Sequence, residues 1–263
     1  MPKKTIKVYN LEGKPAGKME LPLVFATPFR PDVIKRAVLA MQSNSFQRQG
    51  RDPMAGKRTT AESRGTGLAM ARVPRVKGGA GTAAFAPGTV GGRQGHPPTS
   101  QKTIVKRISK KEKHLALNAA IAATALKEVV IKRGHAIEDV LEIPLIVTDD
   151  LENLKRTKEV EQALIHLGVL SDIYRVKESR KIRAGKGKKR GRKMKQAVGP
   201  LLVVSENKGI IEAARNIPGV DIAILKDLNV ELLAPGAHAG RLTIWTNGAV
   251  ERLGEMNDGG AKE

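Results

Sequence analysis

Two stretches of this chain concentrate the side chains that can bind phosphate groups. Residues 43–103 contain ten Lys or Arg but only two acids, and residues 175–195 contain twelve Lys or Arg but only one acid. Both cations form charge-assisted hydrogen bonds with phosphate, and the guanidinium group does so in a bidentate geometry. We therefore expect the two stretches to contact a polyanion through Arg48, Arg51, Lys57, Arg58, Arg64, Arg72, Arg75, Lys77, Arg93, Lys102, Arg183, Lys186, Lys188, Lys189, Arg190, Arg192 and Lys193.

The charge of the chain lies almost entirely in these stretches. The net charge of the 263 residues is +21, and the isoelectric point is about 10.3. The two stretches contribute +8 and +11, so the other residues carry only +2. Such an excess indicates nucleic acid or an anionic membrane as the partner. Aromatic residues make up only 3% of the chain, which argues against base stacking and favours folded RNA recognised by shape and backbone.

The first basic stretch shows no helical or strand periodicity. Glycine or proline occupies sixteen of its positions, and its apolar residues are scattered singly. It cannot bury a core of its own, and a structureless segment of this length inside a compact domain is expected to be functional. We predict that RNA orders both stretches, and that the free protein is sensitive to proteases over residues 46–103 and 178–196. Taken alone, the second stretch would also fit a solvated surface loop or a localisation signal.

Several glycine-rich segments raise the question of a nucleotide site. None lies between a predicted strand and a predicted helix, and none has the spacing of a dinucleotide-binding motif or a P-loop. Glycine also lets two backbones approach closely, which explains these segments better. They are Gly65–Gly67, Gly78–Gly81, Gly88–Gly92 and Gly185–Gly191.

The remaining candidates for catalysis or metal binding are isolated. Asp149 and Asp150 follow a predicted strand, where carboxylates are often catalytic. No partner motif accompanies them, so we interpret them as turn or cap residues. The five histidines have no ligand spacing, and the chain has no cysteine. We therefore expect no catalytic residue, no metal and no cofactor.

The N-terminal half predicts regular elements on both sides of the first basic stretch. Residues 6–21 alternate around a turn and predict a hairpin. A helix is predicted from Pro31 to about Asn44. After the stretch, Ser109 and Glu112 form a capping box, and one long alanine-rich helix is predicted to run to about Lys132, before Gly134.

From residue 144 onward, short apolar runs alternate with helical patterns. We predict strands at 145–147, 201–204, 222–225 and 242–245, with helices through 160–167, through 210–214 and from about 249. This alternation is typical of βαβ units, whose parallel strands are buried on both faces. The predicted fold class is α/β, with a mostly parallel sheet flanked by helices. We expect one domain over residues 1–263, a long irregular basic loop at 44–103 inserted between helices, and a second basic extension at 175–196.

A membrane or secretory role finds no support in the sequence. No run approaches the roughly 18–20 apolar residues that a membrane span needs. The first residues, Met-Pro-Lys-Lys-Thr, lack the apolar core of a secretory signal. We expect an intracellular protein without a membrane partner.

Five segments are recognisable in a fixed order along nearly the whole chain: 60–67 (TAESRGTG), 71–75 (ARVPR), 183–188 (RAGKGK), 216–219 (NIPG) and 233–236 (LAPG). Together they resemble the ribosomal protein L-four family of the large ribosomal subunit, in its archaeal branch. The resemblance implies a Rossmann-like domain on the outer surface of the subunit, a long extension threaded into the large-subunit rRNA, and a role in early assembly. It also implies that the tip of the extension lines the peptide exit tunnel, through Arg64, Gly65, Thr66, Gly67 and Arg72.

We therefore interpret the chain as a non-catalytic, rRNA-binding structural protein of the cytoplasmic large ribosomal subunit. Its expected partners are the large-subunit rRNA, neighbouring large-subunit ribosomal proteins and the nascent polypeptide. One alternative is an RNA-acting enzyme on a Rossmann-like sheet, such as a methyltransferase. It predicts a glycine-rich cofactor turn after the first parallel strand, whereas residues 147–150 contain no glycine. Another is a protein for anionic membranes, which would place its charge on amphipathic helices and not in glycine-rich loops.

Overall fold

The computed structural model describes residues 5–78 and 82–259 of the chain. These residues form two compact units, and each is described by itself. The first, here called the globule, comprises residues 1–41 and 107–263. The second, here called the inserted loop, comprises residues 42–106 and lies in the sequence between α1 (Pro31–Ser45) and α2 (Lys110–Thr124).

A six-stranded sheet forms the centre of the globule, in the strand order β2-β1-β3-β8-β6-β7. β1 and β2 pair in antiparallel fashion, and the other neighbouring pairs are parallel. The predictions of an N-terminal hairpin and of a mostly parallel α/β sheet are thereby confirmed. The strands are β1 (Thr5–Tyr9), β2 (Pro15–Glu20), β3 (Leu145–Val147), β6 (Leu201–Val204), β7 (Asp221–Ile224) and β8 (Thr243–Thr246).

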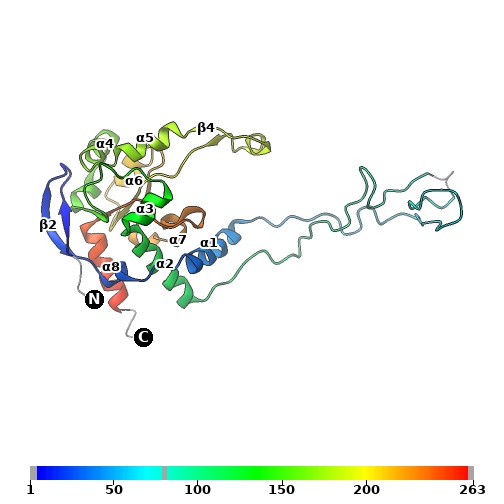
Figure 1. Ribbon diagram of the computed structural model, residues 1–263, viewed down its shortest axis with the longest axis horizontal. Helices are drawn as coiled ribbons and strands as arrows, with labels where there is room; N and C mark the ends of the chain where they lie inside the picture. Colours follow the sequence, from blue (N-terminus) through cyan, green and yellow to red (C-terminus); the bar gives the residue numbers. More distant parts are fainter. Residues whose placement is uncertain (1–4, 79–81, 260–263) are drawn as a thin grey trace. The chain divides into compact units, whose positions relative to one another are not determined.

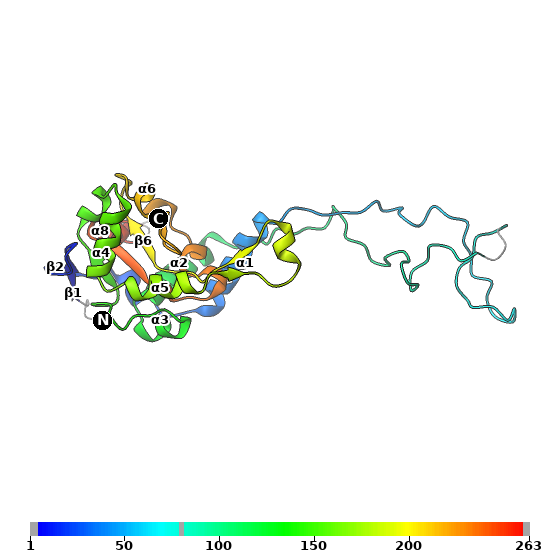
Figure 2. The same ribbon diagram turned by 90° about the horizontal axis from the view of Figure 1, so that it is seen from above.

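Helices cover both faces of this sheet (Figures 1 and 2). They are needed there because every residue of β3, β6 and β8 is buried, so neither face can meet water. One face is covered by α1, α2, α7 (Val230–Leu233) and α8 (Asn247–Gly259). The other is covered by α3 (Lys127–Arg133), α4 (Thr157–His166), α5 (Leu170–Glu178) and α6 (Ile210–Ala214).

Short 3-10 turns complete the globule at Leu23–Ala26, Asp149–Asn153, Lys186–Arg190, Leu225–Asp227 and Pro235–Ala237.

Alternate residues of each central strand pack into two hydrophobic cores, one on each face of the sheet. Leu201 and Val203 belong to the core under α2, whereas Leu202 and Val204 belong to the core under α4. Trp245 is fully buried in the first core, where its ring meets Phe25 edge-on at 5.5 Å between ring centroids.

The prediction of one long helix after the inserted loop is wrong. Its start is confirmed, because the Ser109 side chain accepts a hydrogen bond from the Glu112 amide (3.2 Å). The helix ends at Thr124, however, and α3 follows at an angle of 91°. The reason is tertiary: α2 packs on the first core, whereas Val130 of α3 packs on the second. A straight helix could not reach both faces of the sheet.

Among the described residues, no single helix is long and apolar enough to cross a membrane. The bent pair α2 and α3 meets that test only when the two are joined, by length and composition alone. Its alanine-rich part is buried inside the globule, where residues 119–123 are at most 1% exposed.

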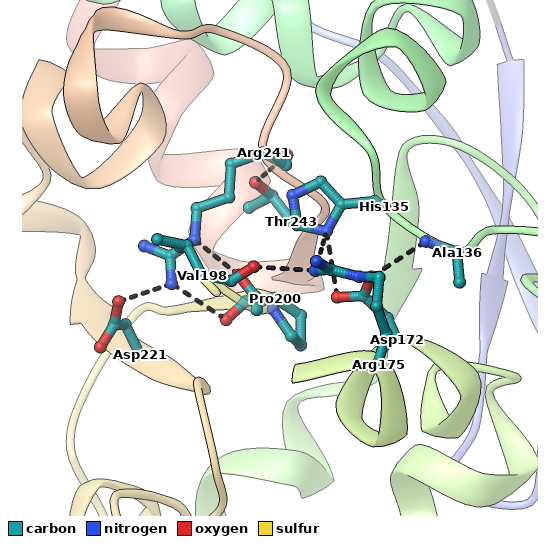
Figure 3. Close-up of polar contacts among 10 residues, drawn as sticks. His135, Ala136, Asp172, Arg175, Val198, Pro200, Asp221, Arg241 and Thr243 are labelled. Carbon is teal, nitrogen blue, oxygen red and sulfur yellow. Dashed lines mark hydrogen bonds and ion pairs between the residues drawn. The ribbon is translucent and has the colours of Figure 1, made fainter. Parts of the chain in front are cut away.

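A buried carboxylate joins α5 to the segment that follows α3 (Figure 3). Asp172 is fully buried and accepts hydrogen bonds from the Ala136 amide (3.0 Å) and the Arg175 Nε (2.8 Å). The ring of His135 contributes a third contact through Nδ1 (3.0 Å). Three partners satisfy a charge that would be costly to bury alone.

The same packing sets the protonation of this group. Burial lowers the pKa of His135, and the positive charges of Arg175 and Arg133 lower it further, which outweighs the attraction of Asp172. Burial alone would raise the pKa of Asp172, but the hydrogen bonds from His135 and Arg175 hold it below its ordinary value. The neutral imidazole therefore donates its Nδ1 hydrogen to an ionised carboxylate.

We predict that the free energy of unfolding falls as the pH is lowered from about 7 to about 5. In this range the unfolded chain takes up a proton at His135 more readily than the folded chain, whose His135 has a lowered pKa, so the folded state loses at most about 1.4 kcal/mol per pH unit. The variant His135→Asn keeps a donor for Asp172 but cannot titrate, and its pH dependence should be correspondingly shallower. Urea unfolding at several pH values measures this, with His96→Asn, at an exposed site, as the control. Equal slopes for His135→Asn and the parent would contradict the assignment.

Candidate nucleic-acid interface

The inserted loop contains no helix or strand, only isolated bridges, in residues 46–78 and 82–106. Its two limbs are tied at the base, where the Lys106 amide donates to the Ser43 hydroxyl (2.9 Å). They meet again where the Arg51 amide donates to the Pro98 carbonyl (3.1 Å). There Gly50 lies so close to the other limb that a Cβ atom on it would be 2.8 Å from the Ser100 nitrogen. Few backbone bonds thus hold the loop.

A small closed turn lies farther along the loop. Glu62 and Arg75 exchange two backbone hydrogen bonds (3.1 and 3.0 Å), and the Ser63 hydroxyl donates to the Arg72 carbonyl (3.2 Å). These contacts enclose residues 64–71, all of which are exposed. Gly65 and Gly67 have φ values of +72° and +91°, which other residues rarely adopt. The structure therefore brings the predicted tip residues, Arg64, Gly65, Thr66, Gly67 and Arg72, into one exposed turn.

Most cations of the inserted loop point into solvent. Arg58 forms an ion pair with Asp52 (2.7 Å). Arg93 packs beside Gly56, where a Cβ atom would come within 2.8 Å of the Arg93 Cδ. Three of the predicted contact residues are half-buried, namely Arg51, Arg75 and Arg93, and seven are exposed, namely Arg48, Lys57, Arg58, Arg64, Arg72, Lys77 and Lys102.

The second basic stretch forms a hairpin, here called the basic arm (residues 179–198), which protrudes from the globule (Figures 1 and 2). β4 (Lys181–Ile182) and β5 (Met194–Lys195) pair in antiparallel fashion, and the Arg183 amide donates to the Lys193 carbonyl (2.8 Å). The 3-10 turn Lys186–Arg190 closes the hairpin between two glycines in the left-handed region. This pairing runs against the expectation that the second stretch has no structure of its own. The extension is also shorter than predicted, because α5 includes residues 175–178.

The basic arm contains no acidic residue that could pair with its cations. Residues 180–195 include ten Lys or Arg and no Asp or Glu. Arg183 is half-buried, with its Nε donating to the Arg192 carbonyl (3.1 Å), while the other predicted contacts are exposed: Lys186, Lys188, Lys189, Arg190, Arg192 and Lys193. Four of these lie on the 3-10 turn, so the arm presents a dense positive tip suited to phosphate.

The roles of Arg175 and Ser179 at the base of the arm were not identified from the sequence. Arg175 counts as one of the cations of the second stretch, but its guanidinium group is bound to Asp172 and to the Val198 carbonyl (2.8 Å) (Figure 3). Ser179, the C-cap of α5, accepts a hydrogen bond from the Ala197 amide (2.8 Å). The spacing of Asp172 and Arg175 is the only sequence signal, since residues three apart face each other on a helix.

The carboxyl edge of the sheet, where α/β folds usually bind ligands, is acidic in this protein. Asp149 accepts a hydrogen bond from the Gly248 amide (2.8 Å) at the start of α8, and Asp150 accepts one from the Thr148 hydroxyl (3.0 Å). Their interpretation as cap and turn residues is thereby confirmed. Glu152, also missed, is fully buried and accepts from Ser205 and Thr246.

Two clefts of about 490 and 330 Å³ lie along this edge. The acids lining them are Asp149, Asp150, Glu152, Glu206, Glu251 and Glu255, against the cations Lys18, Lys208 and Arg252. The excess of carboxylates disfavours a phosphate ligand here. The glycine-rich segments lie elsewhere, in the inserted loop and the basic arm, except that residues 79–81 fall outside the described part. Within the described residues, no group of three or more His, Asp or Glu could hold a metal ion.

The chain is similar in sequence to proteins of one known family. The sequence signature of the ribosomal protein L4/L1 family matches residues 19–256. The large ribosomal subunit protein uL4 of Methanosphaera stadtmanae is 51% identical over 251 residues, which cover 95% of this chain and 96% of that protein. The protein of the same name from Saccharolobus islandicus is 51% identical over 254 residues, covering 96% of this chain and 95% of the relative.

Proposed function

Because the chain belongs to the ribosomal protein L4/L1 family, we propose that its inserted loop and its basic arm bind large-subunit rRNA. The chain is a structural, non-enzymatic component of the large ribosomal subunit in the cytoplasm, where it associates with rRNA and other ribosomal proteins. The proposal concerns which of its surfaces make those contacts and what they achieve.

One observation carries the proposal: the cations of both segments are outside any core and almost without acids. Phosphate neutralisation releases counterions from RNA, which is the main source of affinity for such surfaces. The inserted loop has few backbone bonds of its own, so RNA contacts are also needed to fix its conformation. The carboxyl edge of the sheet offers no comparable surface among the described residues, because it is lined by carboxylates.

The exposed turn at residues 64–71 is the proposed contact with the peptide exit tunnel. The resemblance to the family implies this location for the tip, and the turn presents Arg64 and Arg72 on a glycine-rich backbone that can approach a nascent chain closely. We further propose that the loop fixes rRNA segments relative to one another and that the protein thereby contributes to early subunit assembly. Neighbouring ribosomal proteins are expected to meet the globule.

Footprinting of the purified protein on large-subunit rRNA tests which nucleotides the inserted loop contacts and which the rest of the protein contacts. Residues 51–99 can be removed by joining Gly50 to Ser100, since the two limbs already touch there. The parent protein should protect both interior and surface rRNA nucleotides. The deletion should lose only the interior protection, because the globule and the basic arm are unchanged. Identical footprints for the two proteins would show that the loop does not contact rRNA.

The salt dependence of affinity tests the basic arm. Replacing Lys188, Lys189 and Arg190 together by Gln should lower the slope of log affinity against log salt by roughly two to three, since about three phosphate contacts are lost. A matched triple variant of exposed cations on α1, on α4 and at the end of α6, namely Lys35→Gln, Lys158→Gln and Arg215→Gln, changes the charge equally and should leave more of the slope intact. An unchanged slope in the arm variant would exclude the arm from the interface.

Limited trypsin digestion tests the ordering of the inserted loop by RNA. In the free protein, cleavage should begin within residues 46–103, because few hydrogen bonds hold this segment. Addition of rRNA should slow cleavage there, whereas sites in the helices of the globule should be slow in both states. A loop that resists trypsin without RNA would contradict coupled ordering.

A further inference from the structure

Both ends of the basic arm are fastened to the rest of the globule by side-chain hydrogen bonds. Ser179 lies where the arm leaves α5, and its hydroxyl donates to the Val176 carbonyl (2.6 Å). The same oxygen accepts the Ala197 amide (2.8 Å), which lies where the arm returns. A single hydroxyl thus bridges the outgoing and the returning limb.

Arg175 fastens the next residue of the returning limb. Its Nε donates to Asp172 (2.8 Å) and its Nη2 donates to the Val198 carbonyl (2.8 Å), so one planar group spans both (Figure 3). Asp172 is fully buried and is fixed in turn by the Ala136 amide and His135. The guanidinium group is therefore held rigidly, and its charge is already satisfied by a carboxylate.

The two residues that follow are also held. The Gly199 amide donates to the Gly219 carbonyl (3.1 Å), and the buried guanidinium group of Arg241 donates to the carbonyls of Gly199 (2.8 Å) and Pro200 (3.4 Å). Every residue from Ala197 to Pro200 thus has a backbone group in a hydrogen bond with the globule or the start of the arm. A continuous series of hydrogen bonds thus links the returning limb, from Ala197 to Pro200, to the sheet.

We propose that Arg175 and Ser179 are positioning residues for the RNA contact of the basic arm. They hold the hairpin in its binding conformation before RNA arrives, so that the cations of the 3-10 turn are presented together. The effect on RNA binding rests on the proposed function. The hydrogen bonds by which Arg175 and Ser179 hold the hairpin, here called the clamp, are a property of the free protein. Pre-organisation reduces the entropy lost on binding, without changing how many phosphates are contacted. It therefore has a signature distinct from loss of charge.

The first test is made on the free protein and needs no RNA. In the free full-length protein, hydrogen exchange should be slow at the amides of Ala197 and Arg183, compared with the amides of the exposed turn at 64–71. Ser179→Ala should accelerate exchange at Ala197. Exchange at the unprotected rate in the parent protein would overturn the proposal, whatever the arm does with RNA.

The second test measures rRNA affinity at several salt concentrations. Ser179→Ala and the charge-conserving Arg175→Lys should each weaken binding by about five- to tenfold, as expected for one lost hydrogen bond. Their salt slopes should equal that of the parent, because all phosphate contacts remain available. Ser179→Thr keeps the hydroxyl and should restore both affinity and slow exchange. Ser171 lies on α5, the helix that contains Arg175, and its hydroxyl is bonded to Asp139. Ser171→Ala removes that hydroxyl and serves as the matched control.

The outcomes separate this inference from the proposed function. Faster exchange in Ser179→Ala with unchanged affinity would overturn the positioning role, while the contact of the arm with RNA would stand. A reduced salt slope in Ser179→Ala or Arg175→Lys would also overturn it, since phosphate contacts would then depend on these residues directly. If replacing Lys188, Lys189 and Arg190 leaves the slope unchanged, the proposed RNA contact fails, and the exchange result still decides whether the clamp exists.

Discussion

The free-energy cost of removing a cation from water separates the basic segments of this chain from its packed cores. Arg241 shows what burial of a guanidinium group requires: it is 1% exposed, pairs with Asp221 and donates to the carbonyls of Gly199, Pro200 and Leu232. Residues 180–195 carry ten cations and no acid, so no carboxylate partner exists for them within their own segment. They can only remain in solvent or meet an external polyanion. The parallel sheet and its two cores are consequently built from the remaining, nearly neutral residues.

At the carboxyl edge of the sheet the charged groups are carboxylates, and hydrogen bonds within the protein hold them in place. In a parallel α/β sheet, the carboxyl ends of the strands form the usual ligand site, often with a helix N-terminus facing a phosphate. Here Asp149 occupies that place by accepting the Gly248 amide of α8, and Glu152 is committed to Ser205 and Thr246. The carboxylates that stabilise the edge also repel phosphate. On the proposed function, the fold serves as a scaffold, and contact with nucleic acid is left to the inserted loop and the basic arm.

Patterns that depend on nearest neighbours were readable from the sequence. The apolar runs located β3, β6, β7 and β8 to within a residue or two, and Ser109 marked the start of α2. The bend after Thr124 was not readable, since it exists to bring Val130 to the opposite face of the sheet. The charges and glycines identified both basic segments. The hairpin of the arm was hidden, because its pairing depends on contacts such as Ser179 with Ala197, eighteen residues apart.

The two basic segments therefore present the same chemistry at different entropic cost. The inserted loop has eleven glycines between residues 43 and 103, which widen the range of conformations that the free segment can adopt. On the proposed function, RNA must supply the order that the loop lacks, and part of the interaction free energy is spent on that ordering. The basic arm has glycines as well, but Gly185 and Gly191 sit at the two ends of one turn, between limbs that are paired and anchored. On the proposed function, a contact made by the arm therefore loses less conformational entropy than an equal contact made by the loop. Its contribution to affinity then depends on the anchor at Asp172 as well as on the cations themselves.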